Sequence, residues 1–149
     1  MESPLVTGTA TSRLTNQPGR TIVSARGNHF VVDSPAPLGG PNEELNPIDL
    51  LLGALATCGT FVCEAAALEM GIPLRSVTVT AAGDFDPRGL CGTGEINPRM
   101  QGFRVRLALS GPNADQGAAL AEAFRTRCPV FTTFVRAAPI ELEVEVVPS

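Results

Sequence analysis

Residues 46–58 read NPIDLLLGALATC and begin the longest apolar stretch of the chain. Asn46 suits the capping position of a helix, and Pro47 suits the first turn because that turn leaves its N–H groups without helical partners. The helix is expected to end at Gly71, with Pro73 just beyond it as a stop. Small and polar residues interrupt the apolar run from residue 57 onward, so we expect a core helix and no membrane span.

Residues on both sides of this helix have the patterns of strands. Residues 5–13 and 20–33 are rich in β-formers and are separated by Pro-Gly and Gly-Asn turn signals. Later in the chain, apolar and polar side chains alternate with a period of two in 77–80, 103–109 and 140–146. Two further helices are expected, over about 114–127 and directly after residue 128. The pattern predicts one α+β domain over 1–149, with antiparallel strands and a long helix.

The composition excludes several classes of function. The net charge of −4 and the absence of a basic cluster argue against a nucleic-acid surface. All eleven basic residues are arginines, so no lysine can form a Schiff base. With His29 as the single histidine, a histidine-rich metal site or a Ser-His-Asp triad is hard to build, and we expect no metal or tightly bound cofactor.

The N-terminus has no basic segment followed by an apolar core, so no signal peptide is expected. We therefore expect a cytoplasmic protein, in which structural disulfides are disfavoured. The four cysteines at 58, 63, 91 and 128 contain no Cys-x-x-Cys pair. They are expected to be unpaired packing residues or redox-active thiols.

Two of these cysteines lie at positions where a thiol could be reactive. Cys58 shares the apolar face of the long helix, where it is either a small buried hydrophobe or a reactive thiol. Cys128 precedes Pro129 and would cap the next helix, where the helix dipole and the flanking Arg125 and Arg127 favour a thiolate. A simple capping role fits Cys128 equally well. Cys63 is expected to pack in the core and Cys91 to be an incidental exposed thiol in a loop.

At these residues the chain resembles the OsmC/Ohr superfamily, in its OsmC-like branch. The resemblance rests on NPxDLL leading to ATC at 56–58, on RCPV at 127–130, and on HFVVD at 29–33 followed by Gly39-Gly40. It covers nearly the whole chain. The resemblance implies antiparallel sheets wrapped around a long central helix and an intertwined homodimer.

The same resemblance implies a thiol peroxidase that acts on organic hydroperoxides. The cysteine matching Cys58 would attack the peroxide, and the cysteine matching Cys128 would resolve the sulfenic acid as a disulfide. A dithiol reductant would complete the cycle. Leu51, Leu55, Phe61 and a partner subunit would form an apolar pocket that favours fatty or aromatic hydroperoxides.

One position departs from the pattern of the organic hydroperoxide resistance branch. There a glutamate follows the helix-opening proline and pairs with an N-terminal arginine, whereas this chain has Ile48. Asp49 is turned about 100° away and does not replace that glutamate. Arg20 is our first choice for the arginine that supports the Cys58 thiolate, and Arg13 is the next. Without the carboxylate partner we expect slow peroxidase activity.

Two other functions remain open at this point. The chain could be a non-enzymatic OsmC-like scaffold that binds an apolar small molecule at the dimer interface. It could also be a redox sensor in which a Cys58–Cys128 disulfide alters a partner surface. Catalytic turnover with a hydroperoxide separates the enzyme from both.

Overall fold

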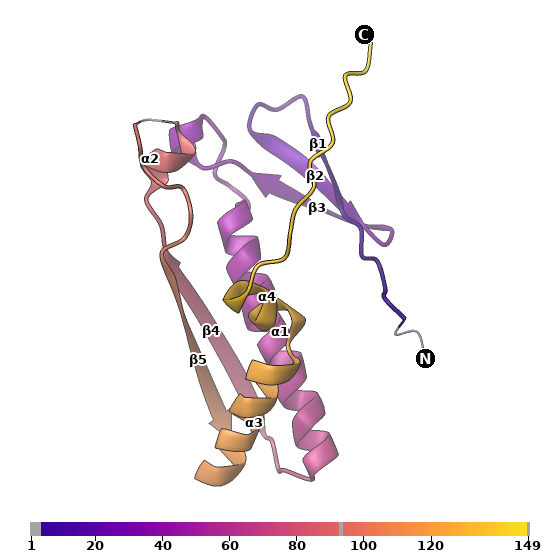
Figure 1. Cartoon of the computed structure of the whole chain (residues 1–149), viewed down its shortest axis with the longest axis vertical. Coiled ribbons are helices and arrows are strands. Elements are labelled where there is room, and N and C mark those ends of the chain that lie inside the picture. Colours follow the sequence, from indigo (N-terminus) through magenta and orange to yellow (C-terminus); the bar gives the residue numbers. More distant parts are fainter. Residues whose placement is uncertain (1–3, 93, 149) are drawn as a thin grey trace. The chain divides into compact units, whose positions relative to one another are not determined.

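A computed structural model describes residues 4–92 and 94–148 of the chain (Figure 1). It has the predicted α+β architecture, with two sheets and one long helix. The residues group into two compact units. The first unit comprises Met1–Gly53 and Gly83–Phe103, and the second comprises Ala54–Ala82 and Arg104–Ser149.

The first unit contains a three-stranded antiparallel sheet. Its strands are β1 (Thr11–Leu14), β2 (Arg20–Ala25) and β3 (Asn28–Asp33), in that order across the sheet. A tight turn at residues 26–27 joins β2 to β3, and both of its residues have positive φ. The register places Arg20 of β2 directly opposite Asp33 of β3.

Helix α1 (Pro47–Met70) begins where the sequence predicts. The Asn46 side chain accepts hydrogen bonds from the N–H groups of Ile48 and Asp49, and Asp49 accepts one from the N–H of Asn46. These bonds pair N–H groups that a helix start otherwise leaves unsatisfied. Gly71 follows the helix with a φ of 65°, which suits a glycine at a helix end.

A two-stranded antiparallel sheet follows α1. It consists of β4 (Ser76–Asp84) and β5 (Gly102–Ser110), joined by a loop that holds the short helix α2 (Pro87–Leu90). Asp86 caps α2 by accepting a hydrogen bond from the N–H of Arg88. Both strands are longer at each end than the alternating segments predicted from the sequence.

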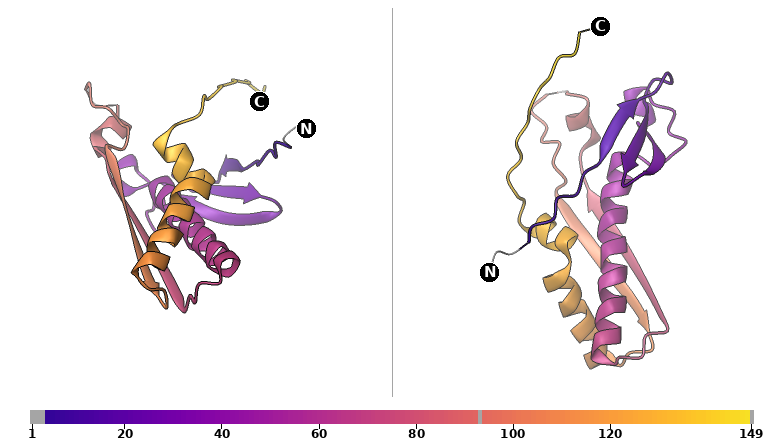
Figure 2. Two further views of the ribbon diagram at one scale, coloured as in Figure 1. Left: turned by 60° about the horizontal axis from the view of Figure 1, so that its bottom comes forward. Right: turned by 90° about the vertical axis from the view of Figure 1, so that its right-hand side faces the viewer.

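The second unit has a helical core. Helix α3 (Ala114–Arg127) starts at a capping box formed by Asn113 and Gln116, and α4 (Pro129–Val135) follows after a single residue. Helix α3 lies along the C-terminal part of α1 in two different views (Figure 2). The buried residues of this core are Leu55, Cys63, Ala66, Ala67, Leu120, Ala123, Phe124 and Cys128. Apolar side chains of β4 and β5 pack against them.

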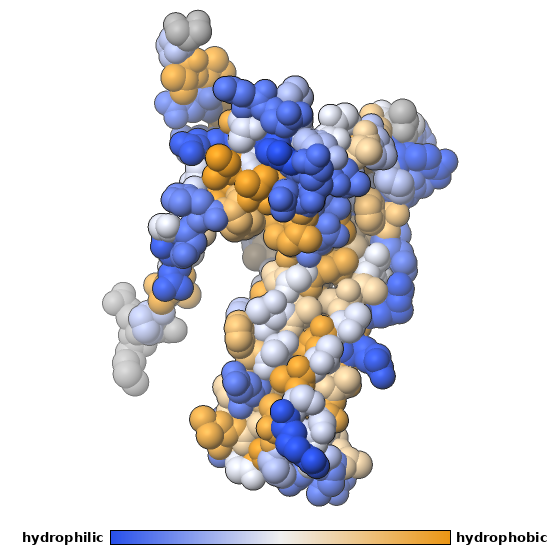
Figure 3. All heavy atoms as spheres, turned by 180° about the vertical axis from the view of Figure 1, so that it is seen from behind, coloured by the Kyte–Doolittle hydropathy of each residue, from blue (hydrophilic) through white to orange (hydrophobic). Residues whose placement is uncertain are grey.

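One face of α1 is buried in this core, and much of the rest is exposed. The buried residues recur at helical spacing from Leu55 through Gly59 and Cys63 to Ala67. Phe61 and Leu68 are 62% and 86% exposed on other faces. Figure 3 shows apolar side chains at the surface of this part of the chain. By length and composition alone α1 could cross a membrane, but a core helix has the same composition.

Two strand predictions are wrong for the single chain. Of residues 5–13 only the last three belong to β1, which begins at Thr11. Residues 140–146 form no strand, although their apolar side chains alternate as predicted. A strand needs a neighbour for its backbone N–H and C=O groups, and among the described residues neither 5–10 nor 140–146 pairs with another strand.

Candidate active site

The structure brings together the two cysteines that the sequence singled out. Cys58 lies on α1, Cys128 lies between α3 and α4, and both belong to the second unit. Their Sγ atoms are 2.6 Å apart, with the Cys128 thiol directed at the Cys58 sulfur. A disulfide bond measures about 2.05 Å, so very little movement separates this contact from a covalent bond. The two cysteines are not joined by a disulfide bond.

The position of Cys128 follows from the proline that comes after it. Pro129 cannot continue α3, because it has no N–H and its ring excludes a helical conformation for the preceding residue. Cys128 therefore ends α3, donating its N–H to the Phe124 carbonyl at 3.2 Å. It also caps α4, where its sulfur accepts a hydrogen bond from the N–H of Phe131 at 3.2 Å.

The Cys58 thiol is partly buried, and its surroundings raise its pKa above the ordinary cysteine value. Burial is the largest cause, and the hydrogen bond with Cys128 is the next. The backbone amide of Val130, at the start of α4, opposes this shift by hydrogen bonding to the Cys58 sulfur. The net direction favours the neutral thiol, so the site stabilises the thiolate only weakly.

The arginines that flank Cys128 are engaged by carboxylates. Arg127 pairs with Glu69 at 2.5 Å, which connects α3 to the last turn of α1. Arg125 pairs with Glu122 one turn earlier on α3. The positive potential expected beside Cys128 is therefore offset by two glutamates, Glu69 and Glu122.

The other two cysteines occupy the positions predicted for them. Cys63 is completely buried, and its thiol donates toward the Leu120 carbonyl at 3.9 Å. Burial raises the pKa of this thiol, as expected for an inert packing residue. Cys91 is exposed and follows α2.

Arg20 lies in the first unit and is held by two acidic side chains. Its guanidinium donates to both carboxylate oxygens of Asp33, at 2.8 and 2.9 Å, and to Glu43 at 2.8 Å. Asp33 is 1% exposed and also accepts hydrogen bonds from the N–H groups of Glu43 and Glu44. These bonds hold the pKa of the Asp33 carboxyl far below its usual range.

The role of Asp33 was not predicted from the sequence. Its signal was an aspartate that ends an apolar strand, directly across a hairpin from an arginine. Glu43 also pairs with Arg20. Asp49 is the acidic residue in the first turn of α1.

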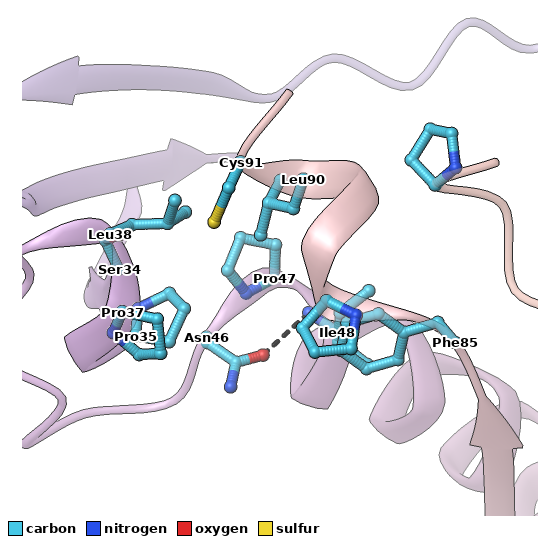
Figure 4. A pocket seen from close by; sticks show the side chains of 12 residues that line it. Ser34, Pro35, Pro37, Leu38, Asn46, Pro47, Ile48, Phe85, Leu90 and Cys91 are labelled. Atoms are coloured by element: carbon cyan, nitrogen blue, oxygen red, sulfur yellow. Dashed lines mark hydrogen bonds between the residues drawn. The ribbon is translucent and has the colours of Figure 1, made fainter. Parts of the chain in front are cut away.

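The first unit also contains an apolar cavity of about 300 Å³ (Figure 4). No charged side chain lines it, and five of its lining residues are prolines. Its walls come from the loop before α1, the start of α1, α2 and the loop that follows α2. Ile48, the residue that replaces the glutamate of the resistance branch, contributes to the lining, and the Cys91 sulfur points into the opening. None of the residues predicted to line a pocket, Leu51, Leu55 and Phe61, belongs to this cavity.

Among residues 4–92 and 94–148, no group of three or more histidine, cysteine, aspartate or glutamate side chains could hold a metal ion.

The fold and site define a class of α+β proteins that carry a thiol pair between a long central helix and a helix N-terminus. The sequence model of the family described as OsmC-like protein matches residues 40–143. The chain belongs to the OsmC-like family. No curated protein sequence matches it significantly.

Solved structures with this fold come from several bacteria. An OsmC-like protein from Mycoplasma pneumoniae has a TM-score of 0.74 at 15% identity, over 89% of each chain. An organic hydroperoxide resistance protein OsmC from Legionella pneumophila has a TM-score of 0.68 at 21% identity, over 91% of this chain and 93% of that one. An organic hydroperoxide resistance protein from Elizabethkingia anophelis has a TM-score of 0.65 at 22% identity, over 91% of this chain and 92% of that one. At these identities the likeness shows the fold alone.

Proposed function

We propose that this protein is a thiol peroxidase that reduces organic hydroperoxides, with Cys58 as the attacking sulfur and Cys128 as the resolving sulfur. The observation that supports this function is the 2.6 Å contact between the two sulfur atoms. The family match supports it further. Two of the structures with the same fold are described as organic hydroperoxide resistance proteins.

The proposed reaction has two steps on sulfur and one reduction. The Cys58 thiolate attacks the peroxide, an S–O bond forms, the O–O bond breaks, and the alkoxide takes up a proton and leaves as an alcohol. The Cys128 sulfur then attacks the Cys58 sulfenic acid, an S–S bond forms, and the hydroxyl group leaves as water. A dithiol reductant returns both thiols by exchange with the disulfide. No metal or bound cofactor takes part.

Thiol counting tests this proposal. One equivalent of cumene hydroperoxide is expected to lower the free thiols of the chain from four to two. Peptide mapping should then find the disulfide between Cys58 and Cys128. Cys58→Ser is expected to abolish the loss, whereas Cys91→Ser removes one exposed thiol from the count and leaves the reaction unchanged. A wild-type chain that keeps all four thiols would rule out the peroxidase.

The preference for organic over inorganic peroxide needs its own comparison. The residues proposed to surround Cys58 in the assembled protein are apolar, so an apolar hydroperoxide should gain from their burial. Cumene hydroperoxide is therefore expected to react faster than hydrogen peroxide. The reverse order would contradict an apolar substrate site.

A binding scaffold without catalysis is the second candidate, and the cavity of the first unit favours it. A volume of about 300 Å³ with apolar walls falls in the range of small-molecule sites. Turnover discriminates between the two functions. The enzyme consumes many equivalents of hydroperoxide when a dithiol such as dihydrolipoamide is supplied, a redox sensor is oxidised once, and a scaffold leaves its thiols unchanged.

We further propose that the protein works as a homodimer in the cytoplasm. The cytoplasm keeps thiols reduced, as the reaction requires. The dimer is supported by apolar surface that the single chain leaves uncovered. Ile140 and Leu142 are 93% and 89% exposed in the extended C-terminal segment, and Leu68 of α1 is 86% exposed. Patches of this kind usually mark an interface between proteins.

A further inference from the structure

The residue after Cys58 is a glycine with no room for a side chain. Gly59 is buried in the middle of α1, where glycine is a poor helix former. A Cβ atom at this position would lie 2.8 Å from Cζ of Phe124 and 3.0 and 3.1 Å from the two Cε atoms. These distances are shorter than carbon atoms normally approach. The aromatic ring of α3 therefore rests directly on the backbone of α1, next to the Cys58 position.

Phe124 is connected to Cys128 in two ways. The backbone carbonyl of Phe124 accepts the N–H of Cys128 at 3.2 Å. Its ring meets the ring of Phe131 edge to face, with centroids 5.1 Å apart and an angle of 66°. The N–H of Phe131 in turn donates to the Cys128 sulfur at 3.2 Å.

We propose that Gly59, Phe124 and Phe131 are positioning residues that set the distance between the Cys58 and Cys128 sulfurs. The depth at which the Phe124 ring rests on Gly59 fixes how closely the α3–α4 junction approaches α1. Phe131 then holds the Cys128 sulfur at the α4 end of that junction. All of these residues lie in the second unit. The proposal rests on the proposed function, because it concerns the step in which the two sulfurs bond.

This positioning acts on one step of the reaction. In that step the Cys128 sulfur displaces the hydroxyl of the Cys58 sulfenic acid, the S–S bond forms, the S–O bond breaks, and water leaves. A change in sulfur spacing therefore slows disulfide formation. In the preceding attack on the hydroperoxide the Cys58 sulfur is the nucleophile, so that step does not require the Cys128 sulfur at bonding distance.

Gly59→Ala tests the spacing with a matched control on the same helix. The added methyl pushes against the Phe124 ring and moves α3 away from α1. Gly53→Ala adds the same methyl to α1 at a position where no atom lies within 4 Å. Both changes improve helix propensity equally, so the difference between the two variants reports the contact with the ring.

The full-length proteins are treated with one equivalent of cumene hydroperoxide in the presence of dimedone, which traps sulfenic acids. Wild type and Gly53→Ala are expected to form the disulfide with almost no trapped Cys58. Gly59→Ala should still form the sulfenic acid, form the disulfide about tenfold more slowly, and accumulate the Cys58 adduct. In Gly59→Ala/Phe124→Leu the smaller side chain makes room for the methyl, so disulfide formation should recover in part; full recovery is not expected, because this change also removes the ring contact with Phe131.

Two results overturn the proposal. In one, Gly59→Ala closes the disulfide at the wild-type rate. In the other, the double variant stays as slow as Gly59→Ala, which means that the ring does not set the spacing. If circular dichroism shows that Gly59→Ala is unfolded, Phe131→Leu replaces it, since this change removes the ring contact and adds no atoms. It too is expected to slow disulfide formation, and a wild-type rate for it counts against the proposal.

A second measurement separates this proposal from the peroxidase. Titration of each protein in a glutathione redox buffer gives the equilibrium of the Cys58–Cys128 disulfide without any peroxide. The effective concentration of one thiol at the other should fall about tenfold in Gly59→Ala and stay unchanged in Gly53→Ala. If the wild type does not react with hydroperoxide but Gly59→Ala and Gly53→Ala differ in this titration, the proposed function fails and the positioning role stands. Equal values for the two variants overturn the positioning role.

Discussion

Among the described residues, Asp33 is the only charged side chain that is buried. Its carboxylate accepts two bonds from Arg20 and two from backbone N–H groups of the loop before α1. Charge-assisted bonds of this kind are among the stronger ones in proteins, and a buried carboxylate needs them to stay ionised. Asp33 thereby ties the three-stranded sheet to the segment that leads into α1.

The low pKa of Asp33 makes the stability of the protein depend on pH. Because the folded-state pKa lies below the unfolded value of about 4, the stabilisation is complete above that value and is lost as the pH falls toward the folded-state pKa. Asp33→Asn should therefore lower the melting temperature at pH 7 and flatten its decline in acid. Thermal melts between about pH 7 and about pH 3 measure both effects.

Asp86→Asn is the control for this prediction. Asp86 also pairs with an arginine, and Arg88 lowers its pKa to about 2, but its side chain is 31% exposed and that of Arg88 is 70% exposed. Exposed ion pairs contribute little to stability. A melting temperature that falls as far for Asp86→Asn as for Asp33→Asn would contradict the importance assigned to Asp33.

The thiol of Cys58 gives a second prediction, which concerns how the rate of thiol oxidation rises as the solution becomes more basic. Burial and the Cys128 thiol raise its pKa, so the reactive thiolate is scarce at neutral pH and increases as the solution becomes more basic. The rate of the first thiol oxidation by hydroperoxide should rise about tenfold per pH unit until the pKa is passed. Cys128→Ser replaces a thiol that helps to raise this pKa, so its profile should shift to lower pH. A rate that is already constant at about pH 6 would show that an unseen group stabilises the thiolate.

At the scale of elements, α1, α3 and α4 could be predicted because their signals are local, whereas the four-residue α2 was not predicted. Asn46 with Pro47, Asn113 with Gln116, and Cys128 with Pro129 each define a helix start within four residues. The sequence also identified both cysteines of the thiol pair, through the resemblance and the helix patterns. Their 2.6 Å contact could not be predicted, because it depends on how α3 packs on α1 around Gly59. The Arg20–Asp33 bond was missed as well, since its sequence signal becomes specific only once the hairpin register is known.

The packing of α3 on α1 should account for much of the stability of the second unit. Leu120 is completely buried between them, whereas Val135 at the end of α4 is 74% exposed. Leu120→Ala is expected to lower the free energy of unfolding by about 2–5 kcal/mol, because it removes buried methyl groups and leaves a cavity. Val135→Ala should change it by less than about 0.5 kcal/mol. Urea unfolding followed by circular dichroism measures both, and equal losses would contradict this account of the core.

At the scale of the whole molecule, the important segment is residues 140–146, which have the pattern of a strand but form none. Residues 140–146 keep a period of two, with Ile140, Leu142, Val144 and Val146 all at least 77% exposed and glutamates between them. In Figure 1 this segment is an extended trace without a helix or strand. A sequence with one apolar and one charged face matches a strand at a half-buried sheet position. This pattern supports the proposed homodimer, in which a second copy would supply the neighbouring strand.

The two faces of this segment therefore predict different effects on assembly. Leu142→Asp/Val144→Asp places charges on the apolar face and should convert the proposed dimer to a monomer, because burying an unpaired carboxylate is costly. Glu141→Gln/Glu143→Gln changes the charged face of the same segment and should leave the dimer intact. Light scattering coupled to size-exclusion chromatography measures the mass of each against the 15.5 kDa chain. A wild-type protein of that mass would rule out the dimer. If Leu142→Asp/Val144→Asp is still a dimer, the interface lies elsewhere, at the exposed face of α1.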